Sequence, residues 1–207
     1  AQRAGDDAVW DRAEALLQES ASLAGLKCRV QPGEGAFYGP KLEFVLKDRL
    51  GRDWQCGTIQ LDLVLPERFD LSYVDASGQK RRPMMLHRAM LGSLERFLGI
   101  LLEHHEGALP VWLAPEQVRV APLNAAAVDY AERFAARLRE GQGRVSVDAR
   151  AESLSRKVVD AHQDGVPWLV VVGPREVEKN AVRLRGRDGQ QQELSQEDAV
   201  ARLLAEC

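Results

Sequence analysis

Met84-Met-Leu-His-Arg-Ala-Met-Leu-Gly-Ser-Leu-Glu-Arg-Phe97 is the stretch from which the rest of the chain can be interpreted. Apolar residues directly after Pro83 are typical of the start of a buried strand. Further along, apolar side chains recur with the period of a helix, at Leu94, Phe97, Leu98, Leu101 and Leu102. The stretch therefore predicts a strand followed by an amphipathic helix that faces a core.

A second strip of the predicted helix could hold an anion. It combines the small residues Gly92, Ser93 and Gly99 with one long cation, Arg96. A guanidinium can fork onto a phosphate or a carboxylate, and the N-terminus of a helix offers free N–H groups. Spacing alone leaves a second interpretation open, in which the small residues allow tight packing and Arg96 forms a structural ion pair.

Composition limits the class of protein. With 207 residues, 45% of them hydrophobic, the chain can form two ordinary domains. A formal net charge of −3 gives no overall basic field for nucleic acid. Cys28, Cys56 and Cys207 share no CxxC spacing, and we expect a reduced, cytoplasmic protein without a membrane span. Because the first residue is Ala1 and not Met, we expect a processed chain or part of a longer one.

Two kinds of region follow one another along the chain. A helix over 6–24, strands over 42–46 and 54–64 and the stretch quoted above predict an α+β part with an antiparallel sheet. A Pro-bounded connection near 108–115 places the domain boundary between residues 110 and 111. Beyond it, strands over 118–121, 145–147, 168–172 and 181–184 alternate with helices over 125–140, 154–163 and 196–206. This alternation predicts an α/β domain with a mixed, largely parallel sheet and flanking helices.

The second strand of the α+β part has one polar and one apolar face. Its alternating members are Ile59, Leu61 and Leu63 against Thr58, Gln60 and Asp62. The polar row is either the floor of a pocket or a solvated outer face, and both remain open. Gln55 has the wrong parity to join the row unless a bulge at Gly57 resets the phase.

Other candidate ligand-binding side chains are isolated in the sequence. Tyr38 and Lys41 lie in a Gly- and Pro-rich loop that could be either a ligand-contacting loop or a plain surface loop. His87 stands alone, as a core residue or as one member of a metal site, which would need three or four ligands. The chain contains no GxSxG, P-loop, HExxH or strand-bound GxGxxG motif.

A charged cluster in the second part could grip RNA. Its acidic members are Glu176 and Glu178, and its cations are Arg175, Lys179, Arg183, Arg185 and Arg187. Carboxylates can read bases while cations hold the backbone. Solvated charges on an edge hairpin are the alternative.

Several long motifs, in order, resemble those of threonyl-tRNA synthetases. Three belong to the class II catalytic domain of that family: Gly35-Ala-Phe-Tyr-Gly-Pro-Lys41, Trp54-Gln-Cys-Gly-Thr-Ile-Gln-Leu-Asp62 and Leu86-His-Arg-Ala-Met-Leu-Gly-Ser-Leu-Glu-Arg-Phe97. The last is similar to the third class-defining motif. Pro110-Val-Trp-Leu-Ala-Pro-Glu-Gln117 resembles the passage into the anticodon-binding domain. The resemblance extends from Asp6 to the C-terminus.

The resemblance implies an ATP-dependent activation of threonine and its transfer to tRNA(Thr), with Mg²⁺ accompanying ATP and a homodimer as the complete enzyme. Arg96 would hold the γ-phosphate end of ATP, and Gln55 its ribose or adenine side. The threonine and adenylate pocket would be lined by Tyr38, Lys41, Thr58 and Gln60.

Two further sites follow from the same resemblance. His87 would be one ligand of a Zn²⁺ ion that takes the amino and hydroxyl groups of threonine, which would help the pocket refuse valine. Glu176 and Arg183 would contact anticodon bases.

The chain also departs from the family. The first two class motifs, the other two zinc ligands and the editing domain would lie upstream of Ala1, and Ala151 and Ser153 stand where the family usually has Asn and Lys. We therefore expect a C-terminal portion that is inactive alone. The alternatives are a non-catalytic tRNA-binding or regulatory paralogue and, less directly, an unrelated nucleotide-binding protein that uses Arg96.

Overall fold

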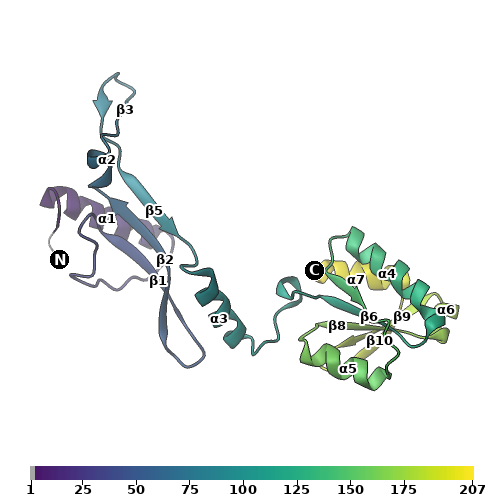
Figure 1. Cartoon of the computed structure of the whole chain (residues 1–207). Helices are drawn as coiled ribbons and strands as arrows, with labels where there is room; N and C mark the ends of the chain where they lie inside the picture. The colour runs from purple at the N-terminus through teal and green to yellow at the C-terminus, as the bar shows by residue number, and fades with distance from the viewer. Residues whose placement is uncertain (1–2) are drawn as a thin grey trace. The chain divides into compact units, whose positions relative to one another are not determined.

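The computed structural model describes residues 3–207, which divide into two compact units. The first unit ends at Leu101 and the second comprises Leu102–Cys207. Figure 1 shows an antiparallel sheet with one long helix in the first unit, and a sheet between helices in the second. Within the described residues, no helix is both long and apolar enough to cross a bilayer.

The first unit is built on a three-stranded antiparallel sheet in the order β1-β2-β5. Its strands are β1 (Lys41–Lys47), β2 (Asp53–Asp62) and β5 (Met85–Ala89), and α1 (Asp7–Leu23) packs on one face. The apolar residues of β2 lie on that face, where Leu61 and Ile59 meet Ala13 and Leu17 of α1. The alternation read from the sequence therefore does separate a helix-covered face of β2 from a polar one.

A β-bulge interrupts the pairing of β1 with β2. Phe44 lies opposite Gly57 while Val45 lies opposite Gln55, so Cys56 is the extra residue. The structure thus confirms a bulge beside Gly57. Since a bulge reverses the alternation of side chains, Gln55 joins the face that carries Thr58 and Gln60.

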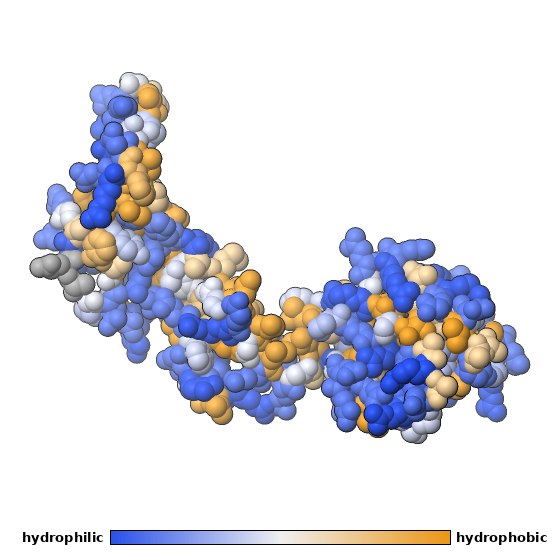
Figure 2. Space-filling view, viewed as in Figure 1, coloured by the Kyte–Doolittle hydropathy of each residue, from blue (hydrophilic) through white to orange (hydrophobic). Residues whose placement is uncertain are grey.

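One packing prediction for the first unit is wrong. The strand β5 and the helix α3 (Leu94–His104) are not buried as predicted: Leu86 is 59% exposed, and no residue of α3 is buried. The helix does form with the predicted period, but no element in the described part of the first unit covers its apolar stripe, and apolar side chains reach the surface there (Figure 2).

Three short elements connect β2 to β5. They are the helix α2 (Leu65–Arg68) and the two-residue strands β3 (Tyr73–Val74) and β4 (Lys80–Arg81), which pair antiparallel.

The second unit contains a five-stranded mixed sheet in the order β10-β9-β8-β6-β7. Its strands are β6 (Val118–Pro122), β7 (Val145–Val147), β8 (Trp168–Val172), β9 (Ala181–Gly186) and β10 (Gln191–Ser195). β6 pairs parallel with β7 and β8, whereas β9 pairs antiparallel with β8 and β10. The prediction of a mixed sheet is confirmed, but the sheet is not largely parallel. The strand β10, which was not predicted, adds a second antiparallel pairing.

Helices cover both faces of this sheet, as expected for an α/β domain (Figure 1). One face packs against α4 (Val128–Glu140) and α7 (Gln196–Glu206), and the other against α5 (Leu154–Gln163). The short helices are η1 (Val111–Leu113), η2 (Ala125–Ala127) and α6 (Pro174–Glu178). Because β8 is covered on both sides, it can be apolar throughout.

Candidate functional site

The loop that carries Tyr38 is held against the end of β2. The amide of Leu61 donates to the carbonyl of Pro40 at 3.1 Å, and that of Leu63 to the carbonyl of Tyr38 at 2.9 Å. A Cβ on Gly39 would lie 1.7 Å from the carbonyl oxygen of Leu61, so only glycine permits this approach. The glycine of the motif therefore fixes the position of its tyrosine.

Four side chains form what we call the polar cluster: Tyr38, Gln60, Asp62 and His87. The Tyr38 hydroxyl donates to Oε1 of Gln60 at 3.2 Å, and its ring lies edge-on to His87, with 6.3 Å between the ring centroids. His87 on β5 is directly opposite Gln60 on β2, and its Nε2 lies 2.9 Å from Oδ2 of Asp62. The polar row of β2 is therefore part of a bonded cluster and is more than a solvated face.

Asp62 links the polar cluster to the backbone of the turn after β2. It is completely buried, and its Oδ1 accepts hydrogen bonds from the amides of Val64 and Leu65, both at 2.9 Å. Burial alone would raise its pKa, but the hydrogen bonds from Leu65, His87 and Val64 hold the pKa below its usual value. A carboxylate can only accept, so the proton in the contact with His87 resides on Nε2.

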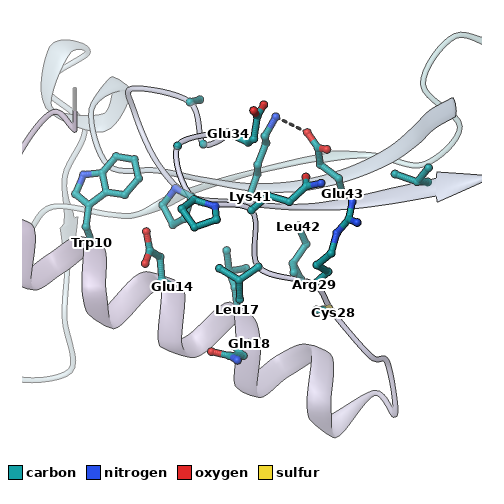
Figure 3. A pocket seen from close by; sticks show the side chains of 18 of the residues that line it. Trp10, Glu14, Leu17, Gln18, Cys28, Arg29, Glu34, Lys41, Leu42 and Glu43 are labelled. Atoms are coloured by element: carbon teal, nitrogen blue, oxygen red, sulfur yellow. Dashed lines mark ion pairs between the residues drawn. The ribbon is translucent and has the colours of Figure 1, made fainter. Parts of the chain in front are cut away.

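Lys41 and Thr58 lie on the same face as the cluster. Lys41 is opposite Gln60 and Glu43 is opposite Thr58 in the β1–β2 pairing, and Lys41 forms an ion pair with Glu43 (Figure 3). The hollow in Figure 3, about 640 Å³, lies between α1, the segment 27–36 and β1. Lys41 is the one predicted site residue among those lining it, and no member of the polar cluster lines this hollow.

The turn before α3 rests on the bulge of β2. Gly92, at φ +69°, would place a Cβ 3.0 Å from the carbonyl oxygen of Cys56, and a Cβ on Gly57 would lie 3.1 Å from that of Met90. Such contacts leave no room for larger residues. Two glycines therefore bring the first turn of α3 close to Gln55.

Arg96 lies at this end of β2. Its guanidinium carbon is 5.5 Å from the ring centroid of Trp54, a cation–π distance, and its amide donates to Ser93 Oγ at 3.2 Å. Arg96 forms no ion pair with any carboxylate that the structure describes. The interpretation of Arg96 as a member of a structural ion pair is therefore not supported.

Trp54 is itself clamped. Its Nε1 donates to Oδ2 of Asp48 at 2.8 Å, and Arg52 lies over the same ring at 5.6 Å. Burial raises the pKa of Asp48, but hydrogen bonds from Trp54 and Arg52 and the charge of Arg52 outweigh this and lower it to about 2. The ring under Arg96 is thus fixed by a charged network at the β1–β2 turn.

The predicted residues of the first unit therefore fall into two groups. Tyr38, Gln60 and His87 are in mutual contact, with Lys41 and Thr58 beside them on one face. Gln55 shares that face beyond the bulge. The guanidinium of Arg96 stacks on Trp54 and does not touch the polar cluster. By the alternation along β2, the side chain of Trp54 lies on the face opposite that of Gln55, Thr58 and Gln60.

The residues described do not make a complete metal site. Over 3–207 there is no group of three or more His, Cys, Asp and Glu side chains close enough to share an ion. His87 offers one imidazole, and zinc needs at least three protein ligands. Any zinc ion held here would require ligands from outside this part of the chain.

Glu176 and Arg183 do meet in the second unit. Oε2 of Glu176 accepts from the amide of Gly173 at 2.9 Å, and Oε1 lies 3.1 Å from a guanidinium nitrogen of Arg183. The carboxylate is 5% exposed, while the side chain of Arg183 remains 40% exposed. In this arrangement Glu176 orients Arg183, which is the member of the pair that a ligand can reach.

The cluster expected around these two residues is only partly formed. Lys179 forms an ion pair with Glu193 at 2.8 Å. The carboxylate of Glu193 also lies 3.6 Å from the guanidinium of Arg183. Arg187 does not take part in this cluster. Its guanidinium is partly buried and donates to the carbonyls of Leu109 and Gly165.

Two features of the second unit were not predicted from the sequence. Ser153 is the N-cap of α5, and its Oγ accepts from the amide of Arg156 at 3.2 Å. Lys157 is 2% exposed and donates to the carbonyls of Pro122 and Asp148, at 2.9 and 2.8 Å, joining the ends of β6 and β7. Its position four residues before Ala161, on the buried face of α5, was the available signal.

Known proteins match the chain over almost its whole length. Residues 7–105 match the tRNA synthetase class II core domain (G, H, P, S and T), and residues 117–206 match an anticodon binding domain. A threonine–tRNA ligase of Caulobacter sp. is 56% identical over 99% of this chain, and one of Paramagnetospirillum magneticum is 53% identical over all of it. The chain spans about a third of the length of these relatives, 31% and 33%.

A solved structure agrees with the sequence matches. The RNA binding domain of threonyl-tRNA synthetase from Cryptosporidium parvum is 36% identical and superposes with a TM-score of 0.90, covering 99% of this chain and 52% of that one. Both domain families, the relatives and the fold point to the same assignment. Both parts of the chain are thus similar to domains of class II aminoacyl-tRNA synthetases, and the chain as a whole is similar to threonine–tRNA ligases.

Proposed function

We propose that the chain is the C-terminal portion of a threonine–tRNA ligase, consisting of the end of the catalytic domain (1–110) and the anticodon-binding domain (111–207). The complete enzyme would form threonyl adenylate from threonine and ATP with Mg²⁺, then transfer threonine to tRNA(Thr). It would work as a homodimer in the cytoplasm.

One observation carries the catalytic part of this proposal. The bulge at Cys56 turns Gln55 onto the face of β2 that holds Thr58 and Gln60. An adenylate lying along that face would meet Gln55 at its nucleotide end and the polar cluster at its amino-acid end. Tyr38, already bonded to Gln60, would orient the amino acid together with it.

Charge assigns roles to the two cations. Arg96 stacks on Trp54, on the face of β2 opposite the polar cluster, and has no carboxylate partner in the described residues. To serve ATP, its side chain would leave that ring and fork onto the terminal phosphate, where it would stabilise the departing pyrophosphate. Lys41 would bring a positive charge to the adenylate side of the face. His87 would supply one ligand to Zn²⁺, which when bound would accept the amino and hydroxyl groups of threonine. The remaining ligands would come from the portion upstream.

In the second unit, Arg183 would contact an anticodon base while Glu176 holds it in position. Binding of tRNA would weaken with salt because phosphate contacts release counterions.

A chimera tests the proposal. The chain replaces the matching third of the Caulobacter relative, and threonine-dependent ATP–pyrophosphate exchange is measured. We expect exchange in the chimera, none in the chain alone, and a loss of at least tenfold in the chimera with Gln60→Ala but not with Gln18→Ala, an exposed position on α1. A folded chimera that binds tRNA(Thr) without exchange would favour the non-catalytic paralogue.

A further inference from the structure

The β3–β4 hairpin leaves the sheet of the first unit beside the polar cluster. The turn after β2, whose amides donate to Asp62, leads through α2 into the hairpin, and the chain re-enters the sheet at Met85, directly opposite Asp62. Figure 1 shows the hairpin extending beyond this end of β2 and β5. The hairpin therefore continues from the end of the polar face at which the amino acid of an adenylate would lie.

Hydrogen bonds hold the hairpin at its turn and at its base. Oδ1 of Asp75 accepts from two amides of the turn, at 2.9 and 3.0 Å, and its Oδ2 accepts from Nε of Arg81 at 2.9 Å. At the base, Arg82 donates to the carbonyls of Pro66 and Leu71, at 3.2 and 2.9 Å. The exposed side chains of the hairpin are thus presented on an ordered backbone.

The register of the two strands places an aromatic ring beside a cation. Tyr73 is directly opposite Arg81, and Val74 is directly opposite Lys80. The ring of Tyr73 belongs to a residue that is 51% exposed, and the side chain of Arg81 is 56% exposed although it is bonded to Asp75. An exposed ring next to a cation can stack an unpaired base while the cation holds the phosphate backbone.

The charge of this segment favours a nucleic acid as its ligand. Residues 68–82 include two carboxylates and four cations, Arg68, Lys80, Arg81 and Arg82, whereas the whole chain has a net charge of −3. Among the residues that the structure describes, the side chains of Arg68 and Lys80 have no hydrogen-bond or ion-pair partner. These two cations can therefore bind phosphates without breaking an existing contact.

We propose that the β3–β4 hairpin binds RNA and that its ligand is the unpaired 3′ end of tRNA. Tyr73 stacks on an unpaired base, Arg81 holds the adjoining phosphate, and the flexible Lys80 holds a neighbouring one. Arg82 keeps its structural role at the base of the hairpin. The choice of tRNA rests on the function proposed above, in which the 3′ end must reach the activated amino acid beside the polar cluster.

The test measures, by fluorescence anisotropy, binding of the chain to an RNA hairpin that reproduces the acceptor stem of tRNA(Thr) with its unpaired 3′ end. This RNA has no anticodon, so base reading by the second unit does not contribute. We expect affinity to fall about fivefold or more when the unpaired 3′ nucleotides are removed, and equally for Tyr73→Ala on the intact RNA. Tyr73→Phe, which keeps the ring, should bind within about twofold of the wild type.

A salt series tests the cations. Lys80→Ala should lower the salt slope of binding by about 0.7, the value for one phosphate contact on a single strand. The controls Leu23→Ala and Lys27→Ala, at exposed positions elsewhere in the first unit, should change neither affinity nor slope. The amide NMR spectrum verifies that each variant folds.

Three results would overturn the proposal. They are equal affinity of the wild type for the RNA with and without its 3′ end, unchanged affinity in Tyr73→Ala, and self-association of the chain that Tyr73→Ala abolishes, because this last result would assign the hairpin to a second copy. Failure of the ligase assignment would appear separately, in the exchange assay of the chimera, which contains no RNA.

Discussion

Replacing Gly39 with alanine should detach the Tyr38 loop from β2. The added Cβ would lie 1.7 Å from the carbonyl oxygen of Leu61, half the ordinary contact distance of 3.4 Å. The obstructing atoms belong to backbone, so no side-chain rotation can relieve the clash. Either the loop or the strand must move, and the hydrogen bonds from Leu61 to Pro40 and from Leu63 to Tyr38 are lost.

The cost follows from those two bonds. At about 0.5–1.5 kcal/mol each, their loss amounts to roughly 1–3 kcal/mol of local stability. By the relation of 1.4 kcal/mol to a factor of ten, the amides of Leu61 and Leu63 should exchange with solvent about 5- to 150-fold faster. Hydrogen exchange followed by NMR measures this locally, independently of how the second unit unfolds.

Gly35→Ala is the matched control in the same loop. Its Cβ would lie no closer than 3.8 Å to any atom beyond its chain neighbours, so we expect a change within about 0.5 kcal/mol. Unchanged exchange at Leu61 and Leu63 in Gly39→Ala, with the Tyr38 signals unmoved, would refute the role given to this glycine.

Three further perturbations test other parts of the structure. Lys157→Met leaves two buried carbonyls without a donor, at a cost of about 1–3 kcal/mol each, so the urea midpoint of the second unit, followed by the fluorescence of Trp168, should fall. The control Lys179→Met removes only a surface ion pair and should cost under about 1 kcal/mol. Asp48→Asn should destabilise the first unit at pH 7, and since the folded pKa of about 2 lies below the ordinary 3.8, the difference from wild type should vanish as the pH falls through that interval. Identical urea midpoints at pH 7 for Asp48→Asn and wild type would contradict this. Arg183→Lys keeps the charge but loses the guanidinium that pairs with Glu176, so it should weaken tRNA(Thr) binding in a filter assay while leaving the salt slope of binding unchanged.

Local patterns predicted much of the fold because they act over a few residues. The strands and helices of the second unit follow the alternation of apolar runs and of capping residues such as Ser195, whose side chain accepts from the amide of Asp198 at the start of α7. The segment that forms β10 is polar and exposed, so hydrophobic periodicity could not reveal it. For the same reason α3 was correct as a helix but wrong as a core element, since burial depends on what else packs nearby.

The candidate site divides in a similar way. Parity placed Thr58 and Gln60 on one face, and the glycine in the strand indicated the bulge that brings Gln55 to it. The pairing of Asp62 with His87 could not be derived, because it joins residues 25 positions apart through the β2–β5 register. The stacking of Arg96 on Trp54 likewise depends on how the turn at Gly92 rests on the bulge.

The most direct test of the central assignment is binding of the chain to tRNA(Thr) and to the same transcript with its anticodon replaced, at fixed salt. We predict at least tenfold weaker binding of the altered transcript, and loss of that difference in Arg183→Ala. Equal affinity of the wild-type chain for the two transcripts would contradict the assignment of this chain to threonine-specific tRNA recognition.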